Sequence, residues 1–182
     1  MGDASIRRKK EKSGDKGSNF NENAGYNNLR EIWCLRKSVV VPMRYLIDTC
    51  IFIHYATDRG LLSRDVLALL KDYDTVICMS AESIRELIIQ HNNGKLVSKY
   101  WKTSEQMIDD IRDKYFIEIL PLAEEHMRTY SRLRLNFAQD HKDPSDHLII
   151  SHAITEKMPL ISDDGKFDFY TKQGLNLILN KR

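Results

Sequence analysis

The sequence predicts an α/β domain with a central, mostly parallel sheet that is covered by helices on both faces. Short runs of β-branched and aliphatic residues alternate along the chain with longer segments of helical periodicity. Strands that are regularly separated by helices form parallel sheets, and such sheets need helices on both faces. The chain has 182 residues, of which 42% are hydrophobic, which is sufficient for one domain with a substantial core.

The segment before the first predicted strand has a different composition. Residues 1–28 are dominated by Gly, Ser, Asn, Lys and Glu and contain few large apolar side chains. We therefore expect residues 1–42 to form a disordered N-terminal extension and residues 43–182 to form the folded domain, with Met43 as a candidate native start. The basic run at residues 7–10 could bind RNA or an acidic partner, although a solvated tail is the simpler interpretation.

The first half of the domain is expected to contain three strands and three helices. The apolar stretch MRYLIDTCIFIHY, which contains RYLID, is predicted as a buried strand, and TVICM and FIEIL are predicted as the second and third strands. A helix in LSRDVLALLKDY would be capped by Ser63, and a helix in AESIRELIIQH by Ser80. A further helix is expected from Glu105 to Lys114. The inward face of the first of these helices would contain Leu62, Val66, Leu69, Leu70 and Tyr73.

The second half continues the alternation. A helix in AEEHMRTYSRLRL leads through a polar loop to a helix in PSDHLIISHAITEK, where Pro144 suits the first turn. PLIS and LNLIL are predicted as the last two strands, separated by DDGKFDFYTKQG.

Composition limits the possible classes of protein. Lys and Arg number 28 against 26 Asp and Glu, and a net charge of +2 does not by itself indicate a nucleic-acid-binding protein. The three cysteines lack CxxC or Cys/His ligand spacing, which fits a reducing, cytoplasmic setting. The N-terminus lacks the apolar region of a signal peptide, and no apolar run approaches the length of a bilayer span. We expect a soluble cytoplasmic protein without membrane contact.

Four carboxylates follow the predicted strands and are the candidate functional residues: Asp48, Glu86, Asp146 and Asp164. The binding crevice of a parallel sheet lies beyond the carboxyl ends of its strands, so the alternation of strand and helix should return all four to one edge. Asp48 carries the strongest signal, since it lies between apolar residues and an unpaired carboxylate is costly to bury.

Each of the other three also has a purely structural interpretation. Glu86 could complete a capping box with Ser83, and Asp146 could favour a helix N-terminus electrostatically. Asp164 could belong to an Asp-Gly turn with Gly165. Taken singly, these interpretations are at least as plausible as a functional one.

A cluster of carboxylates repels itself, and a hard divalent cation with oxygen ligands, Mg²⁺ or Mn²⁺, commonly relieves that repulsion. Such a centre can activate a bound water as the nucleophile and neutralise charge on a phosphate. The pattern is therefore typical of metal-assisted phosphodiester hydrolysis.

Four segments, YLIDTCIFIHY, SAESIREL, HKDPSDHLIISHA and LISDDGKFDFY, closely resemble the PIN-domain ribonucleases, in particular the VapC toxins of type II toxin–antitoxin systems. The resemblance covers Met43 to about Leu179. Each motif alone is weak, but four in the same order and spacing make a specific match. It implies a PIN-like three-layer α/β/α domain.

The resemblance also implies roles for particular residues. The metal-binding and catalytic positions fall on Asp48, Glu86, Asp146 and Asp164. Auxiliary positions fall on Thr49, Asp143 and Ser162, where Ser stands in place of the usual Thr. Asp163 competes with Asp164, but its spacing to Phe167 is wrong. The chain departs from the DPFDR form of the family at Ser145 and His147, and His147 would change a substrate-facing basic contact.

The expected function is that of a Mg²⁺-dependent endoribonuclease acting as the toxin of a type II toxin–antitoxin pair. Basic residues that flank the motifs would hold the RNA backbone, namely Arg85, Lys95, Lys142 and Lys166. The resemblance implies a cognate antitoxin and a homodimer as partners, besides the RNA substrate.

Other interpretations remain open. The same acidic pocket could belong to a non-catalytic PIN-like interaction module that binds a partner protein or RNA. A zinc site of His147 and His152 is disfavoured, because residues five apart do not share a helix face as in HExxH. A phosphatase in which Asp48 is the nucleophile would require a second Asp two residues later, but that position is Cys50.

Overall fold

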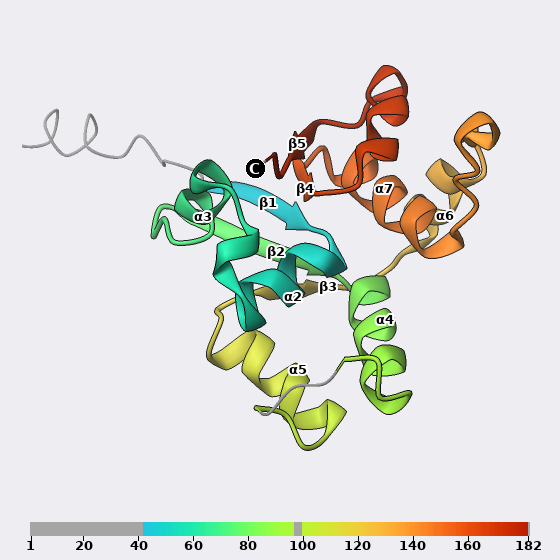
Figure 1. Ribbon diagram of the computed structural model, residues 1–182. Helices are drawn as coiled ribbons and strands as arrows, with labels where there is room; N and C mark the ends of the chain where they lie inside the picture. Colours follow the sequence, from blue (N-terminus) through green and yellow to red (C-terminus); the bar gives the residue numbers. More distant parts are fainter. Residues whose placement is uncertain (1–41, 97–99, 182) are drawn as a thin grey trace, which may run out of the picture. The chain divides into compact units, whose positions relative to one another are not determined.

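Strands from both halves of the chain join in one parallel sheet in the computed structural model, which describes residues 42–96 and 100–181 (Figure 1). All of its neighbouring strands pair in parallel, in the order β3-β2-β1-β4-β5. This arrangement confirms the predicted α/β fold class. The expected disorder of residues 1–42 falls almost entirely outside the described residues and stays a prediction. The strands are β1 (Met43–Ile47), β2 (Thr75–Ser80), β3 (Glu118–Leu120), β4 (Leu160–Ser162) and β5 (Leu177–Leu179).

Helices connect consecutive strands, as the sequence predicted. The α-helices are α2 (Thr49–Thr57), α3 (Arg64–Leu69), α4 (Ala81–Asn92), α5 (Ser104–Asp113), α6 (Glu124–Tyr130) and α7 (Pro144–Glu156). Shorter 3₁₀ elements are η1 (Arg59–Leu61), η2 (Phe137–Gln139) and η3 (Gly165–Gln173). Across the described residues, no helix combines the length and apolar character that crossing a bilayer requires.

The core consists of two clusters, one on each face of the sheet, because successive strand residues point to opposite faces. On β1, Ile47 joins the cluster that contains residues of α2, α3, α4 and α5, whereas Leu46 joins the cluster that contains residues of α7 and η3. Met79 and Cys78 of β2 divide between the two clusters in the same way. Figure 1 shows α7, with α6 beside it, on the side of the sheet away from α2 and α5. Both faces are therefore covered.

Polar side chains fix the starts of several helices. Ser63 and Ser80 accept hydrogen bonds from the backbone N–H groups of Val66 and Glu82, which confirms both predicted caps. Pro144 occupies the first turn of α7, as expected.

Two details of the sequence interpretation were wrong. The stretch MRYLIDTCIFIHY is not one strand, since β1 ends at Ile47 and Asp48 is the N-cap of α2. The apolar residues after Asp48 are therefore helical and pack inward from α2. Tyr73 does not belong to the apolar face of α3, because the helix ends at Leu69 and the Tyr73 side chain is fully exposed.

The sheet order creates a switch point between β1 and β4. From β1 the chain proceeds through β2 to β3 on one side, and then returns to β4 on the other side of β1. Ligands of open α/β sheets bind in the crevice outside the carboxyl ends of strands at such a point. Asp48 follows β1 and Asp163 follows β4, so both lie at this crevice.

Candidate metal centre

A cleft of about 390 Å³ opens at the switch point. Of the described residues that line it, none is a Lys or Arg, and more than half are carboxylates. All four of the predicted acidic residues contribute to this lining, and so does Asp163. The lining residues are Asp48, Thr49, Cys50, Ile53, Glu86, Gln90, Asp146, Asp163 and Asp164.

Asp48 is the most deeply buried of these carboxylates, with 6% of the residue exposed. Its Oδ1 accepts a 2.7 Å hydrogen bond from the backbone N–H of Thr49. Its Oδ2 accepts a 2.7 Å hydrogen bond from Ser162 Oγ and a 3.2 Å contact from Cys50 Sγ. Burial raises the pKa of Asp48 despite these donors. The carboxylate that the sequence marked as costly to bury thus has a donor network on both oxygens.

Glu86 faces the cleft from the second turn of α4. Its Oε2 accepts a short 2.5 Å hydrogen bond from Thr49 Oγ1. Burial and the nearby charge of Asp48 raise the pKa of Glu86. The alternative capping box of Ser83 with Glu86 is wrong, since α4 begins after Ser80 and the buried Ser83 Oγ has no hydrogen-bond partner within the described part of the chain.

Asp146 and Asp164 approach each other from α7 and from the start of η3. Ligand atoms of Asp146, Asp164 and His141 all lie within 4.8 Å of one another. Burial, followed by the charges of neighbouring carboxylates, raises the pKa of Asp146 from 3.8 to about 8. Asp164 Oδ1 also accepts a hydrogen bond from the backbone N–H of Lys166, so it caps a turn while it faces the cleft.

Asp163 lies in the same cleft but is committed to other partners. Its Oδ2 lies 2.9 Å from His54 Nε2. Although burial alone would raise it, the pKa of Asp163 is lowered by the nearby Cys50 thiol and by its contact with His54. Asp163 is therefore the less available of the two adjacent aspartates for an ion, which supports the choice of Asp164.

Asp143 borders the site without lining the cleft. It is the N-cap of α7, where its Oδ1 accepts a 2.9 Å hydrogen bond from the backbone N–H of Ser145. Its charge contributes to the raised pKa values of Glu86 and Asp146. Its expected auxiliary role stays a prediction.

Arg85 lies next to the cleft but is already engaged. Its guanidinium contacts both carboxylate oxygens of Glu82, with the shortest distance 2.5 Å between Nη2 and Oε1. The same Nη2 donates a 2.8 Å hydrogen bond to Ser145 Oγ, at the start of α7. Arg85 thus joins α4 to α7, and an RNA contact would have to use its remaining donors.

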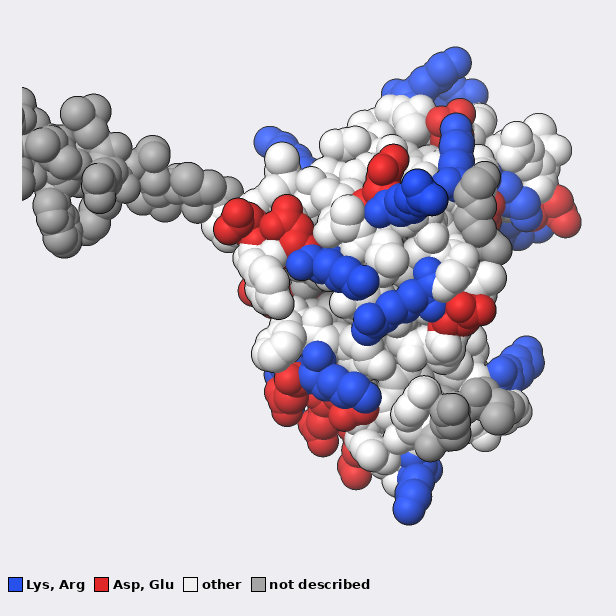
Figure 2. Space-filling model, turned by 60° about the vertical axis from the view of Figure 1, so that its left-hand side comes forward, with Lys and Arg blue, Asp and Glu red and all other residues white. Residues whose placement is uncertain are grey.

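The three predicted lysines are exposed, and Lys142 forms an ion pair of 2.6 Å with Asp140. Lys95 lies on the surface shortly after α4, and Lys166 lies on the surface in the first turn of η3. Figure 2, which brings the α3 side of the molecule forward, shows Lys and Arg interspersed with Asp and Glu rather than gathered in one field. Their RNA-binding role stays a prediction.

His147 does not face the substrate side of the cleft, contrary to expectation. It is 1% exposed, and its ring packs between His141 and Tyr170. Burial lowers its pKa, and its Nε2 has no hydrogen-bond partner among the described residues. The ring therefore belongs to the packing of α7 against η3.

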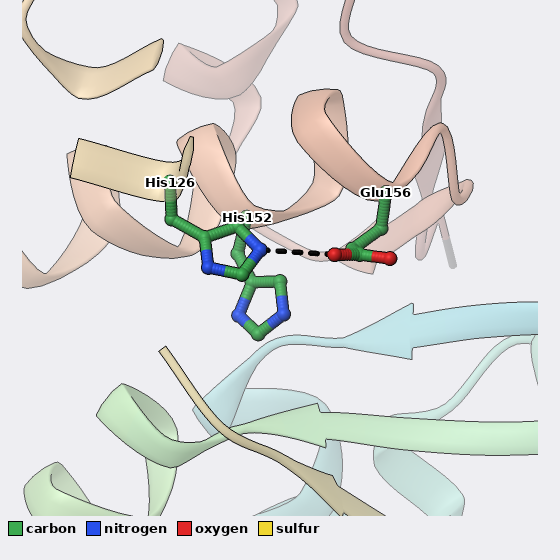
Figure 3. A group of neighbouring side chains, drawn as sticks. All are labelled: His126, His152 and Glu156. Carbon is green, nitrogen blue, oxygen red and sulfur yellow. Dashed lines mark hydrogen bonds and ion pairs between the residues drawn. The ribbon is translucent and has the colours of Figure 1, made fainter. Parts of the chain in front are cut away.

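A second group of potential ligands lies away from the cleft, where His126 of α6 meets His152 and Glu156 of α7 (Figure 3). The backbone N–H of Ala123 donates to His126 Nδ1 at 2.8 Å, so the ring proton is on Nε2, which lies 3.1 Å from Glu156 Oε1. His126 Nε2 therefore has no free lone pair for an ion. The two ring centroids are 4.1 Å apart and the ring planes are tilted by 40°, so the rings pack against each other. We interpret this group as a structural contact between α6 and α7.

A family model for the PIN domain matches residues 45–172, which is more than half of the chain. The chain belongs to the PIN domain family. This membership confirms the expected resemblance to VapC-like PIN-domain proteins. A comparison with curated protein sequences finds no match.

Solved structures resemble this PIN domain over almost their full length. One chain in the structure of VapBC2 from Rickettsia felis, bound to a DNA fragment from the VapBC2 promoter, is 27% identical to this chain and has a TM-score of 0.50. The match covers 75% of this chain and 97% of that chain. A chain of VapBC-1 from nontypeable Haemophilus influenzae is 22% identical with a TM-score of 0.57, over 77% and 100%. A chain of FitAcB from Neisseria gonorrhoeae is 17% identical with a TM-score of 0.52, over 75% and 96%. The last two establish similarity of fold alone.

The PIN domain brings the four predicted carboxylates together and adds residues that the sequence interpretation missed. Gln90 lines the cleft four residues after Glu86, a spacing that places both on one face of α4. His141 contacts Asp146 and had no sequence signal of its own beyond its nearness to the motif. The donor set consists mainly of carboxylate oxygens, which suits a hard divalent cation such as Mg²⁺ or Mn²⁺.

Proposed function

We propose that this PIN-domain protein is a Mg²⁺-dependent endoribonuclease that acts as the toxin of a type II toxin–antitoxin pair. One observation carries the proposal. Carboxylates from four separate segments meet in a cleft whose described lining contains no Lys or Arg, and the pKa values of Asp48, Glu86 and Asp146 are all raised there. Such a cluster is stabilised by a cation with oxygen ligands.

The roles of the chain's own residues follow from their contacts. Asp48, Glu86, Asp146 and Asp164 would hold Mg²⁺ or Mn²⁺. Ser162 and Thr49 fix the carboxylates of Asp48 and Glu86 through their hydroxyl groups. When bound, the ion would supply an activated water and neutralise charge on the scissile phosphate.

RNA would reach the cleft past the individual basic residues that flank the motifs. Lys166 lies close enough to the site to lower the pKa of His141, and Lys142 directly precedes the N-cap of α7. Positive charges at these positions would contact backbone phosphates, which carry no sequence information themselves. We propose Arg85, Lys95, Lys142 and Lys166 for this role.

The toxin assignment rests on the family resemblance and on the likeness to VapBC2. A cognate antitoxin would silence the enzyme by placing a basic segment at the carboxylates, where a guanidinium can pair with two oxygens at once. A homodimer is likewise proposed from the resemblance.

Incubation of total RNA with the purified full chain tests the proposal. We expect discrete cleavage products in Mg²⁺, none in EDTA, and none from the folded Asp48→Asn variant. Cleavage by Asp48→Asn at the rate of the unmodified protein would refute the metal-site assignment. Absence of cleavage by the unmodified chain, together with unimpaired growth on its induction, would favour the non-catalytic interaction module.

A further inference from the structure

His141 is buried between the cleft and the core, with only 2% of the residue exposed. Its Nε2 lies 3.0 Å from Oδ2 of Asp146, and its Nδ1 lies 2.8 Å from the hydroxyl of Tyr170. The ring also packs edge-on against His147 and against Tyr170. Both nitrogens thus have a partner, and the ring has a fixed orientation.

The partners of His141 determine where its proton lies. The backbone N–H of Asn136 donates to the Tyr170 hydroxyl at 3.3 Å, which leaves the hydroxyl proton free to point at His141 Nδ1. The ring proton is then on Nε2 and is donated to Asp146 Oδ2. When Asp146 is ionised, as it would be with a cation bound, a bare Nε2 would set one lone pair against another. The hydrogen-bond chain therefore runs from Asn136 through Tyr170 and His141 to Asp146.

We propose that His141 is the positioning residue of Asp146. Its Nε2–H holds Oδ2 and leaves Oδ1 of the same carboxylate for a divalent ion shared with Asp164. Donors that orient a ligand in this way commonly support metal sites. The inference rests on the proposed function, because it assigns His141 a role toward the ion that the cleft would hold.

The alternative is that His141 binds the ion directly, since its ligand atom lies within 4.8 Å of those of Asp146 and Asp164. Direct ligation would require Nε2 to give up its proton and Tyr170 to accept from Nδ1. A glutamine at this position distinguishes the two roles, because its amide nitrogen can take the place of Nε2 as a donor to Asp146. An asparagine is the matched control, since its shorter amide reaches only the position of Nδ1.

The test is Mn²⁺ binding to the full chain without RNA. Binding is measured as the loss of the free Mn²⁺ signal in electron paramagnetic resonance. We expect His141→Gln to bind within about threefold of the unmodified protein and His141→Asn to bind about 10–100-fold more weakly, the usual cost of losing a donor behind a ligand. Circular dichroism confirms that each variant is folded.

Each outcome decides between the two roles. Equal weakening in both variants would indicate a direct ligand, and no weakening in either would remove His141 from the site; both results overturn the inference while the metal centre stands. Failure of the unmodified protein to bind Mn²⁺ would overturn the proposed function and the inference with it.

If His141→Asn does not fold, Tyr170→Phe decides, because it keeps the buried ring and removes only the hydroxyl. Unchanged Mn²⁺ affinity in Tyr170→Phe would refute the hydrogen-bond chain from Asn136 to Asp146.

Discussion

Ser162, the last residue of β4, donates a 2.7 Å hydrogen bond to Oδ2 of Asp48, which directly follows β1. Ser162 Oγ also accepts from the backbone N–H of Asp164 at 3.1 Å. One buried hydroxyl therefore joins two of the candidate ligands across the switch point of the sheet.

Removal of this hydroxyl should affect both stability and cleavage. Ser162→Ala leaves Asp48 Oδ2 and the Asp164 N–H short of a partner, so we expect a loss of about 1–3 kcal/mol in the free energy of unfolding. Ser162→Thr keeps the hydroxyl that the family usually has and should retain cleavage. Urea unfolding and RNA cleavage of the pair check this. Equal cleavage by the Ala and Thr variants would contradict a role for the hydroxyl.

Asp146 should make the metal-free protein less stable as the pH rises toward 8. The unfolded chain releases this proton near the ordinary value of 3.8, whereas the folded protein holds it to a pKa of about 8. Between these values the folded state binds more protons, so its stability falls with rising pH. Asp48 and Glu86, whose pKa values are also raised, act in the same direction.

Thermal unfolding in EDTA tests this dependence between about pH 7.5 and 8.5, where the histidines of the unfolded chain are almost fully deprotonated. The buried histidines, whose pKa values are lowered, have the opposite effect, which is largest near and below their ordinary value of 6.5. We expect the melting temperature to fall across the tested range, and to fall less in Asp146→Asn. Added Mg²⁺ should restore more stability at the upper end of this range than at its lower end. A melting temperature that rises with pH in EDTA would contradict the charge repulsion.

Thr49 should support catalysis through Glu86. Its Oγ1 donates the 2.5 Å hydrogen bond to Glu86 Oε2, and Thr49→Val removes the donor while it keeps the shape of the side chain. We expect cleavage by Thr49→Val to fall about 10-fold, at the lower end of the usual cost of losing a hydrogen-bond donor to a metal ligand. Thr49→Ser should retain activity. Cleavage rates at a series of Mg²⁺ concentrations check both. Identical rates for the Val and Ser variants would contradict the prediction.

His126 should contribute to stability and not to metal binding. Its Nδ1 accepts the backbone N–H of Ala123 at the start of α6. In His126→Asn the amide oxygen can replace Nδ1, whereas His126→Phe has no acceptor. We expect the Phe variant to be less stable by about 1 kcal/mol, the usual cost of a lost cap. Stabilisation of the unmodified protein by Zn²⁺ that disappears in His126→Phe would instead indicate a metal site.

The strands and most helix starts could be predicted because local signals agree with the tertiary structure. Ser63 and Ser80 cap the helices that the pattern placed after them. The run after Asp48 was misread as strand because β-branched residues there also fit a buried helix, and periodicity does not separate short buried helices from strands. Tyr73 follows helical spacing beyond Leu69, but α3 ends first.

The candidate site was predictable to the extent that parallel strands bring their carboxyl ends together. Asp48 and Asp164 required only this rule. The partners of the ligands were not predictable in the same way. His141 acquires its contact with Tyr170, 29 residues away, only when η3 packs against α7. His147 was assigned to the cleft from its place in a motif, whereas packing turns it into the core.

The most direct test compares two Asp→Asn substitutions at helix starts. Asp48 caps α2 inside the cleft, and Asp58 caps η1 on the exposed surface, so the same chemical change is made at two N-caps. The measurement is the initial rate of cleavage of an RNA fragment mapped from total RNA, in Mg²⁺. We predict that Asp58→Asn keeps the unmodified rate and that Asp48→Asn loses about 100-fold or more, beyond the usual cost of losing a supporting donor. Equal rates for the two variants would contradict the metal centre.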